Sequence, residues 1–149
     1  MDAKEIVKRY KSGERDFREA NLTRANLRGA NLSGVNLTSA KLTGADLSGV
    51  DLTWAKLGGA DLAGADLTRA KLSGANLSGV DLTGTNLTGA ILRGANLSGV
   101  NLTGAKLIGV DVTGADLSEA NLSGATVDKG LGRAKSLRGA TMPDRTTYA

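Results

Sequence analysis

The sequence contains no cysteine and no histidine among its 149 residues. Without cysteine the chain forms no disulfide and offers no thiol nucleophile, and without histidine it lacks the side chain most often used as a general acid or base. These two residue types are also the usual ligands of zinc. Their absence argues against an enzyme, so we expect no catalytic residue, no cofactor and no metal site.

Aromatic residues and long apolar runs are also scarce. One tryptophan, two tyrosines and one phenylalanine leave few rings on which bases could stack, which disfavours nucleic acid as a partner despite the net charge of +4. Nowhere do 18 apolar residues follow one another, and the charged segment 1–11 lacks the apolar stretch of a signal peptide. We therefore expect a soluble, cytoplasmic protein without membrane contact.

The sequence is rich instead in a five-residue repeat. From Phe17 to Val127 an apolar residue stands at every fifth position, and 20 of these 23 positions are leucine. Asn or Asp usually precedes this residue, and Ser or Thr usually follows it. Alanine or valine stands two positions before it in nearly every unit, and glycine stands two positions after it in 16 of the 23 units.

This period excludes a helix and a flat strand. Five residues of α-helix turn through about 500°, so successive leucines would spread around the helix instead of forming one apolar stripe. In a flat strand an odd period would send consecutive leucines to opposite faces. The chain must therefore bend once in each unit, and four right-angled bends close a square coil that stacks on the next one.

Glycine marks the expected corner, because it tolerates the positive φ required at the third residue of a type II turn. Several corners carry another residue: Glu19, Arg24, Ser39, Trp54, Arg69 and Glu119. Positive φ is unfavourable for these side chains, so we expect their corners to use a different turn type.

Units such as Ala30-Asn31-Leu32-Ser33-Gly34 resemble those of the pentapeptide-repeat proteins. The flanking segments 6–17 and 139–144 are similar to those of cyanobacterial members. The resemblance implies an all-β fold, a right-handed quadrilateral parallel β-helix, and it also supplies the handedness. Several members of this family resemble DNA in shape and charge and bind DNA gyrase, so DNA mimicry directed at gyrase is an alternative function.

The acidic residues give little support to that alternative. A DNA mimic needs rows of carboxylates along the rod, whereas the predicted stacks are short: Asp46 over Asp66, and Asp61 over Asp81. Lysines are interspersed in equivalent columns, and the overall charge is positive. We consider a ligand-binding protein or an enzyme less favoured still, because a packed square column leaves no pocket.

The start of the chain is predicted to cap the solenoid. Segment 1–14 forms a short helix and turn in this prediction, and Ile6 and Tyr10 share the apolar side of that helix. An open solenoid end exposes strand edges and its last layer of leucines. We therefore expect the helix to cover this end, with Phe17 beneath it.

The solenoid is predicted to span 15–129, followed by a C-terminal loop and cap segment, 130–149. The pattern fails over 128–136, and then Leu137 and Met142 return in the old phase. We expect a loop or short helix and then a partial last turn. An uncovered end would favour a homodimer formed through that end of the solenoid.

Residues that break the outward polar pattern are the candidates for binding a partner. Trp54 stands at a corner, Ile91 replaces Asn, Asp or Lys, and Ile108 replaces Ser or Thr. Ile91 and Arg93 are predicted to share one face with Trp54, with Ile108 just around the corner. Single exposed apolar residues are also common on ordinary surfaces. Our functional hypothesis is a non-enzymatic scaffold that binds an unidentified protein through these four residues.

Overall fold

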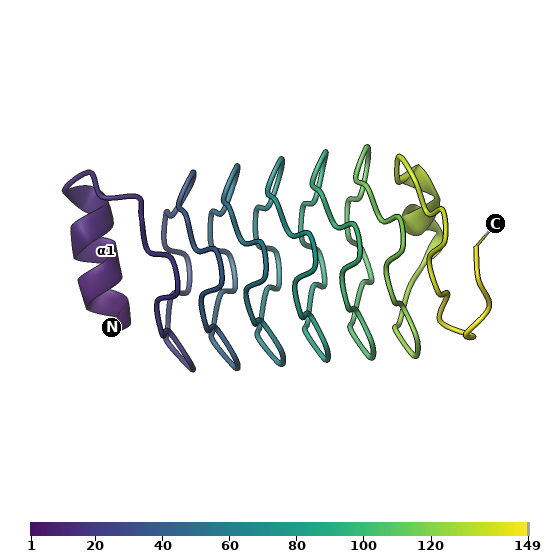
Figure 1. Ribbon diagram of the computed structural model, residues 1–149, viewed down its shortest axis with the longest axis horizontal. Helices are drawn as coiled ribbons and strands as arrows, with labels where there is room; N and C mark the ends of the chain where they lie inside the picture. The colour runs from purple at the N-terminus through teal and green to yellow at the C-terminus, as the bar shows by residue number, and fades with distance from the viewer. Residues whose placement is uncertain (149) are drawn as a thin grey trace.

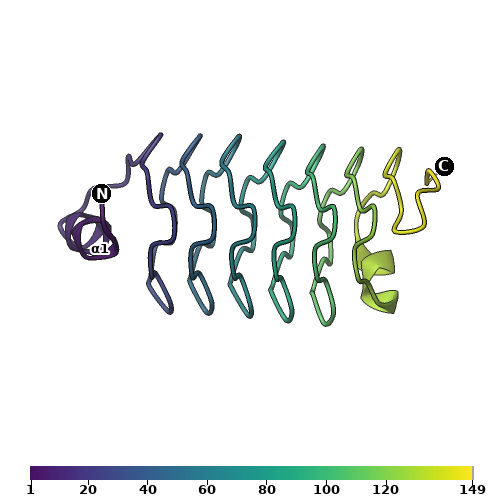
Figure 2. The same cartoon turned by 90° about the horizontal axis from the view of Figure 1, so that it is seen from below.

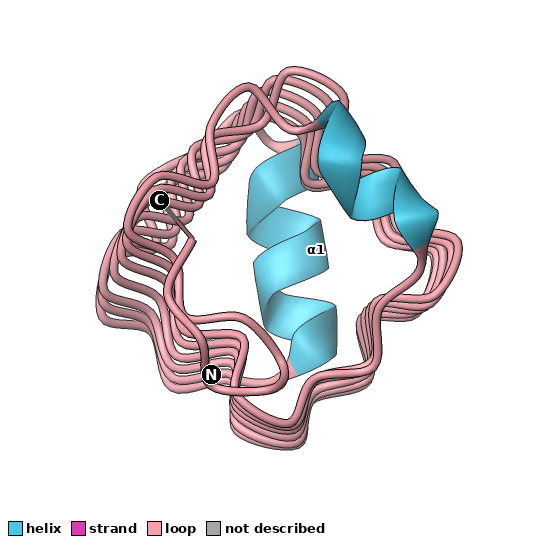
Figure 3. Ribbon diagram, turned by 90° about the vertical axis from the view of Figure 1, so that its right-hand side faces the viewer, coloured by secondary structure: helices cyan, strands magenta, loops and turns pink. Residues whose placement is uncertain are grey.

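The structure is a computed structural model and describes residues 1–148. It is a rod of stacked coils, with helix α1 at one end and the C-terminal segment at the other (Figure 1). The view along the rod shows a four-sided outline in which successive coils superpose (Figure 3). Ala149, the last residue of the predicted cap segment, lies outside the described residues.

Hydrogen bonds between neighbouring coils define the coil length. The N–H of Leu32 donates to the C=O of Asp51 at 2.8 Å, and the N–H of Asp51 donates to the C=O of Ala30 at 2.9 Å. The parallel bridges, such as that between Asn31 and Asp51, join residues 20 positions apart throughout the solenoid. Each of these bridges involves a single residue of either coil, because the chain turns before a longer strand can form.

Leucine and alanine side chains fill the inside of the coils. In a typical unit Ala75 is 1% exposed and Leu77 is 0% exposed. Thr85 takes a position that is elsewhere Ala or Val, and it is also fully buried. Its hydroxyl donates to the C=O of Leu62 at 3.0 Å, so no polar group is left unsatisfied there. The predicted inward leucine column is therefore confirmed.

The prediction for the non-glycine corners was wrong. Their φ angles lie between 57° and 62°, in the same region as those of the glycine corners, at Glu19, Arg24, Ser39, Trp54, Arg69 and Glu119. The reason is the stacking of the coils. At Trp54 the N–H donates to the C=O of Ser73 in the next coil at 2.9 Å, while the N–H of Ala55 closes the turn onto the C=O of Leu52 at 2.9 Å. Both bonds require the same corner geometry, so the ladder overrides a local cost of about 1 to 2 kcal/mol.

Most of these corner side chains lie over the corner glycine of the next coil. A Cβ atom built on Gly74 would lie 2.5 Å from Cε3 of Trp54, and one built on Gly89 would lie 3.2 Å from Cγ of Arg69. Glycine at these two corners therefore leaves room for a neighbouring side chain, in addition to allowing a positive φ. Sequence reasoning assigned glycine only the second role.

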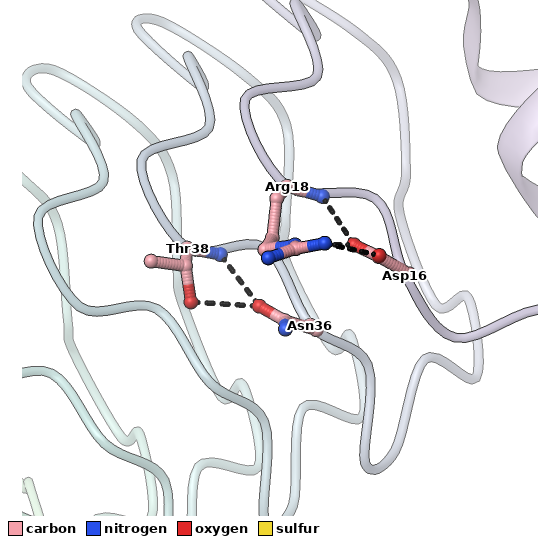
Figure 4. A network of polar contacts seen from close by, with 4 residues as sticks. All are labelled: Asp16, Arg18, Asn36 and Thr38. Atoms are coloured by element: carbon pink, nitrogen blue, oxygen red, sulfur yellow. Dashed lines mark hydrogen bonds and ion pairs between the residues drawn. The ribbon is translucent and has the colours of Figure 1, made fainter.

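The outward Asn and Asp side chains stabilise the turns. Oδ1 of Asn36 accepts hydrogen bonds from the Thr38 N–H at 3.1 Å and from the Thr38 hydroxyl at 2.7 Å (Figure 4). One coil earlier, Oδ1 of Asp16 accepts from the Arg18 N–H at 3.2 Å, and the same carboxylate pairs with the Arg18 guanidinium (Figure 4). Such local bonds are the reason why Asn and Asp favour turns.

Helix α1, Ala3–Lys11, lies across the first coil (Figure 3). Asp2 is its N-cap, since its carboxylate accepts the N–H of Glu5 at 2.8 Å. Ile6 points into the end of the leucine column and is fully buried. The helix therefore covers the apolar layer that the first coil would otherwise expose to water.

Tyr10 and Phe17 complete this end of the rod. The Tyr10 hydroxyl donates to the C=O of Ser33 at 2.6 Å. One coil later the corresponding C=O, that of Thr53, accepts a ladder bond from Gly34 at 2.8 Å, so Tyr10 takes the place of a missing coil. The ring of Phe17 is 3% exposed beneath the cap.

Near the other end, a 3₁₀-helix, η1 (Lys129–Arg133), replaces one side of the last complete coil (Figure 2). Its Leu131 is 6% exposed and extends the apolar column, although it stands one position out of phase with the repeat. The ladder then resumes, with a parallel bridge between Asp116 and Ser136. Of the two alternatives predicted here, a loop or a short helix, the structure contains the short helix, and a partial last turn follows it.

The C-terminal residues fold back onto the last turn. Thr141 forms an antiparallel bridge with Thr147, and the N–H of Tyr148 donates to the C=O of Ala140 at 2.8 Å. The coils extend to Thr141, beyond residue 129 where we placed the end of the solenoid. This antiparallel segment occupies the hydrogen-bonding edge of the last turn.

Candidate interaction surface

Trp54 is the most exposed large apolar side chain of the solenoid, at 70%. Its backbone is fixed by the ladder bond to Ser73, and its ring lies against the next corner, at Gly74. The ring is therefore held along one edge while most of its surface faces solvent. A fixed aromatic side chain loses little conformational entropy on binding and provides a large apolar contact area.

Ile91 and Arg93 lie on the same side as Trp54, further along the rod. Ile91 is half buried in a column of otherwise polar residues, between Lys71 and Asp111. Arg93 is exposed, and its guanidinium pairs with the carboxylate of Asp111 at 3.2 Å. The N–H of Gly74 donates to the C=O of Arg93 at 2.9 Å, so the backbone beneath the Trp54 ring is bonded directly to the Arg93 unit.

Ile108 is 41% exposed and flanks the corner at one edge of this side. Its C=O accepts the N–H of Gly89 at 3.0 Å, and the N–H of the following Gly109 donates to the carboxylate of Asp128 at 2.9 Å. These bonds fix the backbone of Ile108 next to the start of η1. Trp54 and Arg93 belong to coils that are two apart and are linked through the intervening unit of Ser73 and Gly74, and Ile108 lies at the periphery.

Asp carboxylates of the solenoid accept hydrogen bonds within their own turns, and they do not form a continuous row of charges along the rod. The pKa of Asp46 is lowered below its ordinary value, because the Ser48 hydroxyl and then the Ser48 N–H donate to its carboxylate. Asp46 bridges to Asp66, which is the short acidic stack predicted from the sequence. The next coil presents Asn86 in the same column, so the run of carboxylates ends there.

Among the residues that the structure describes, no three or more Asp and Glu side chains lie close enough together to hold a metal ion. The same residues contain no helix that is both long and apolar enough to cross a membrane.

Sequence reasoning treated α1 only as a cap and missed a groove that this helix forms with the first coil. Lys4 and Lys8 stand four positions apart on the helix, with Val7 beside them, and all three line that groove. Spacing of i and i+4 places side chains on one helical face, so the basic face was visible in the sequence. Its position over the coil was not.

Comparison with known proteins identifies relatives of the whole repeat region. The family model described as pentapeptide repeats matches in 8 copies, over residues 16–53, 45–84, 81–118 and 95–129. A comparison of the sequence with curated proteins finds no match.

Two solved structures are similar in both sequence and fold. The crystal structure of Rfr23, a pentapeptide-repeat protein from the cyanobacterium Cyanothece 51142, is 31% identical with a TM-score of 0.65, and the alignment covers 85% of this chain and 97% of Rfr23. AT2G44920, from the thylakoid lumen of Arabidopsis thaliana, is 35% identical with a TM-score of 0.53, covering 62% of this chain and 68% of its own.

A third structure, of the plasmid-mediated fluoroquinolone resistance protein QnrB1, is 20% identical with a TM-score of 0.31, and the alignment covers 85% of this chain and 77% of that one. This likeness is too weak to carry an argument about function.

Proposed function

The chain belongs to the pentapeptide-repeat family, and on this basis we propose that it is a rigid, non-enzymatic scaffold that binds a partner protein through the side of the rod. The fold of this family, a right-handed quadrilateral β-helix, confirms the predicted fold class and handedness. A continuous hydrogen-bond ladder keeps the positions of surface side chains fixed relative to one another. Such a surface pays little conformational entropy when a partner binds.

The observation that carries the proposal is the exposed ring of Trp54 on an otherwise polar repeat. Binding hot spots are enriched in Trp and Arg, and Arg93 lies two coils from Trp54 on the same side, in the unit bonded to Gly74 beneath the ring. We therefore assign the contact to Trp54, Ile91 and Arg93, with Ile108 at its margin.

Both ends of the rod are covered by the chain itself, by α1 at one end and by the segment around Thr147 at the other. This arrangement disfavours end-to-end stacking of two rods through their apolar layers. The homodimer predicted through a solenoid end stays a prediction, and light scattering of the purified protein would test it.

DNA mimicry receives less support from the surface charges. The net charge is +4, and lysines alternate with carboxylates, as in the bridge between Lys41 and Asp61. Potentials of mixed sign do not reproduce the uniform field of a duplex. We expect purified gyrase to supercoil DNA at an unchanged rate in the presence of this protein, and potent inhibition would contradict the scaffold proposal.

Affinity capture from the source cell tests the proposed surface. Trp54→Ala combined with Ile91→Ser should lower affinity for the captured protein at least tenfold, equivalent to about 1.4 kcal/mol. The matched control, Arg69→Ala combined with Asn76→Ser, changes another positive-φ corner and another outward side chain, and it should bind normally. Undiminished binding by the first variant, with an unchanged melting temperature, would refute the assignment.

A further inference from the structure

A groove of about 560 Å³ lies between α1 and the first coil. The helix provides one wall with Ala3, Val7 and three lysines, and the coil provides the other with residues 26–30. Its floor is apolar, since Leu27 is buried while Val7 and Ala30 pack half exposed against the core. The groove thus offers an apolar contact surface that is open to solvent.

The walls of this groove carry charge of one sign. Lys4, Lys8 and Lys11 of α1 face it, together with Arg28 of the coil, and none of its lining residues is Asp or Glu. Asp2 lies in the neighbouring hollow, where its carboxylate is occupied as the N-cap of α1. Four cations around an apolar floor favour a ligand that combines carboxylates with an aliphatic group.

The coil wall also presents an unpaired strand edge. In the second coil, the N–H of Asp46 donates to the C=O of Ala25 at 2.9 Å, and its C=O accepts the N–H of Leu27 at 2.8 Å. Asn26 holds the same position in the first coil, but its N–H and C=O have no hydrogen-bond partner within residues 1–148. On the next side of that coil, the Tyr10 hydroxyl satisfies the C=O of Ser33, so the helix covers that part of the edge and leaves the part inside the groove open.

We propose that this groove binds an extended acidic peptide segment of a partner protein, with an aliphatic side chain on the groove floor. The peptide backbone pairs with Asn26 as an added strand, a recognition mode that exposed sheet edges support. Its aliphatic side chain contacts Val7, and its carboxylates lie beside Lys4, Lys8 and Arg28. This site is at the end of the rod and is separate from the surface around Trp54.

A fluorescein-labelled peptide of sequence Glu-Glu-Val-Glu-Val-Glu-Glu tests the proposal by fluorescence anisotropy. Binding should saturate, and it should weaken as NaCl is added, because the pairing is electrostatic at an exposed site. Replacing the valines with serine, or the glutamates with lysine, should each weaken binding at least tenfold. Two further peptides carry N-methyl groups on alternate backbone nitrogens, so that each has one of its two hydrogen-bonding edges blocked. Only one edge of the peptide can pair with Asn26, so one of these two peptides should lose at least tenfold in affinity. Equal binding by both methylated peptides would contradict the added strand.

Variants of the protein locate the site. Lys4→Gln with Lys8→Gln should weaken binding at least tenfold, and Val7→Ser should do so without a change of charge. The matched control, Lys129→Gln with Lys135→Gln, removes the same charge from the other end and should bind as the parent does. Circular dichroism would show that each variant keeps its fold.

Equal losses in the variant and control pairs, or no loss in either, would overturn the proposal. Anionic vesicles provide the competing occupant, because a basic helical face can also lie on a lipid surface. Cosedimentation with phosphatidylglycerol vesicles in the absence of any peptide binding would assign the groove to lipid and refute a peptide site.

Discussion

Replacing Gly74 with alanine tests how the Trp54 ring is held. Gly74 has φ of +67°, and a Cβ atom there would lie 2.5 Å from Cε3 and Cζ3 of Trp54. The unfavourable φ is common to every glycine corner, whereas the clash with an indole ring is specific to this one. Gly79→Ala is the matched control, because Gly79 has φ of +66° and no atom lies within 4 Å of the added Cβ.

The two substitutions should differ in cost. Alanine in the left-handed region costs about 1 to 2 kcal/mol, and this is the whole effect expected for Gly79→Ala. Trp54 is 70% exposed, so the remaining third of its surface, roughly 75 Å² at about 25 cal/mol per Å², contributes at most about 2 kcal/mol. Displacing the ring should therefore raise the cost of Gly74→Ala above that of Gly79→Ala by up to about 2 kcal/mol.

Guanidinium chloride denaturation, followed by circular dichroism, measures both free energies of unfolding. Trp54 is the single tryptophan, so its fluorescence reports the ring directly, and emission should shift to longer wavelength in Gly74→Ala but not in Gly79→Ala. In a Trp54→Ala background, Gly74→Ala should cost no more than the control, since the clash is gone. Equal costs for the two glycine substitutions, with unchanged emission, would refute the placement of the ring over Gly74.

Three further experiments test the core and the turns. Leu77→Lys should cost several kcal/mol, because it buries an unpaired ammonium group, whereas Asn76→Lys should cost about 1 kcal/mol through loss of a turn bond; similar melting temperatures would contradict the inward and outward assignment. Thr85→Val should change stability by less than about 1 kcal/mol, since it fits the same space and removes only the donor to Leu62; a larger loss in thermal denaturation would show that this bond holds the coils together. The pKa of Asp111 is lowered by the Thr113 hydroxyl and N–H and by Arg93, so its stabilising effect is complete above the unfolded pKa of about 3.9 and is lost as pH falls through the folded value. Asp111→Asn should therefore reduce the fall in melting temperature between about pH 5 and pH 2, and identical profiles would exclude a contribution from Asp111.

The four-sided coil and its core could be predicted from periodicity, whereas the handedness of the coil came from the family resemblance. A period of five with an apolar residue in each unit permits one arrangement in which all the leucines point inward, and each inward position repeats one coil later. Leu131 shows the limit of this reasoning. It fills the apolar column from a 3₁₀-helix one position out of phase, and only the packing of η1 against the last coil reveals that placement.

The corners could not be predicted because their geometry is imposed by neighbouring coils. At Trp54 the local preference opposes positive φ, but the hydrogen bond to Ser73 belongs to a ladder that includes every coil. A turn rule that considers four consecutive residues omits a partner about 20 residues away. The groove beside α1 was missed for a similar reason, because it depends on the orientation of the helix over the coil.

A solenoid of identical units presents the same surface in every coil, so specific recognition depends on the units that differ. Some differences have an internal explanation, as Thr85 does, because its hydroxyl bonds within the core. Ile91 has none, since it cannot accept the turn bond that Asn or Asp makes in other units, and the N–H of Arg93 has no hydrogen-bond partner within residues 1–148. In the units that carry lysine at the equivalent position, the same turn bond is missing, but the lysine places a charged group in solvent. Ile91 instead exposes part of an apolar side chain. The lost turn bond and the exposed apolar surface have no explanation within the coil itself, which is the physical reason for including Ile91 with Trp54 in the proposed contact.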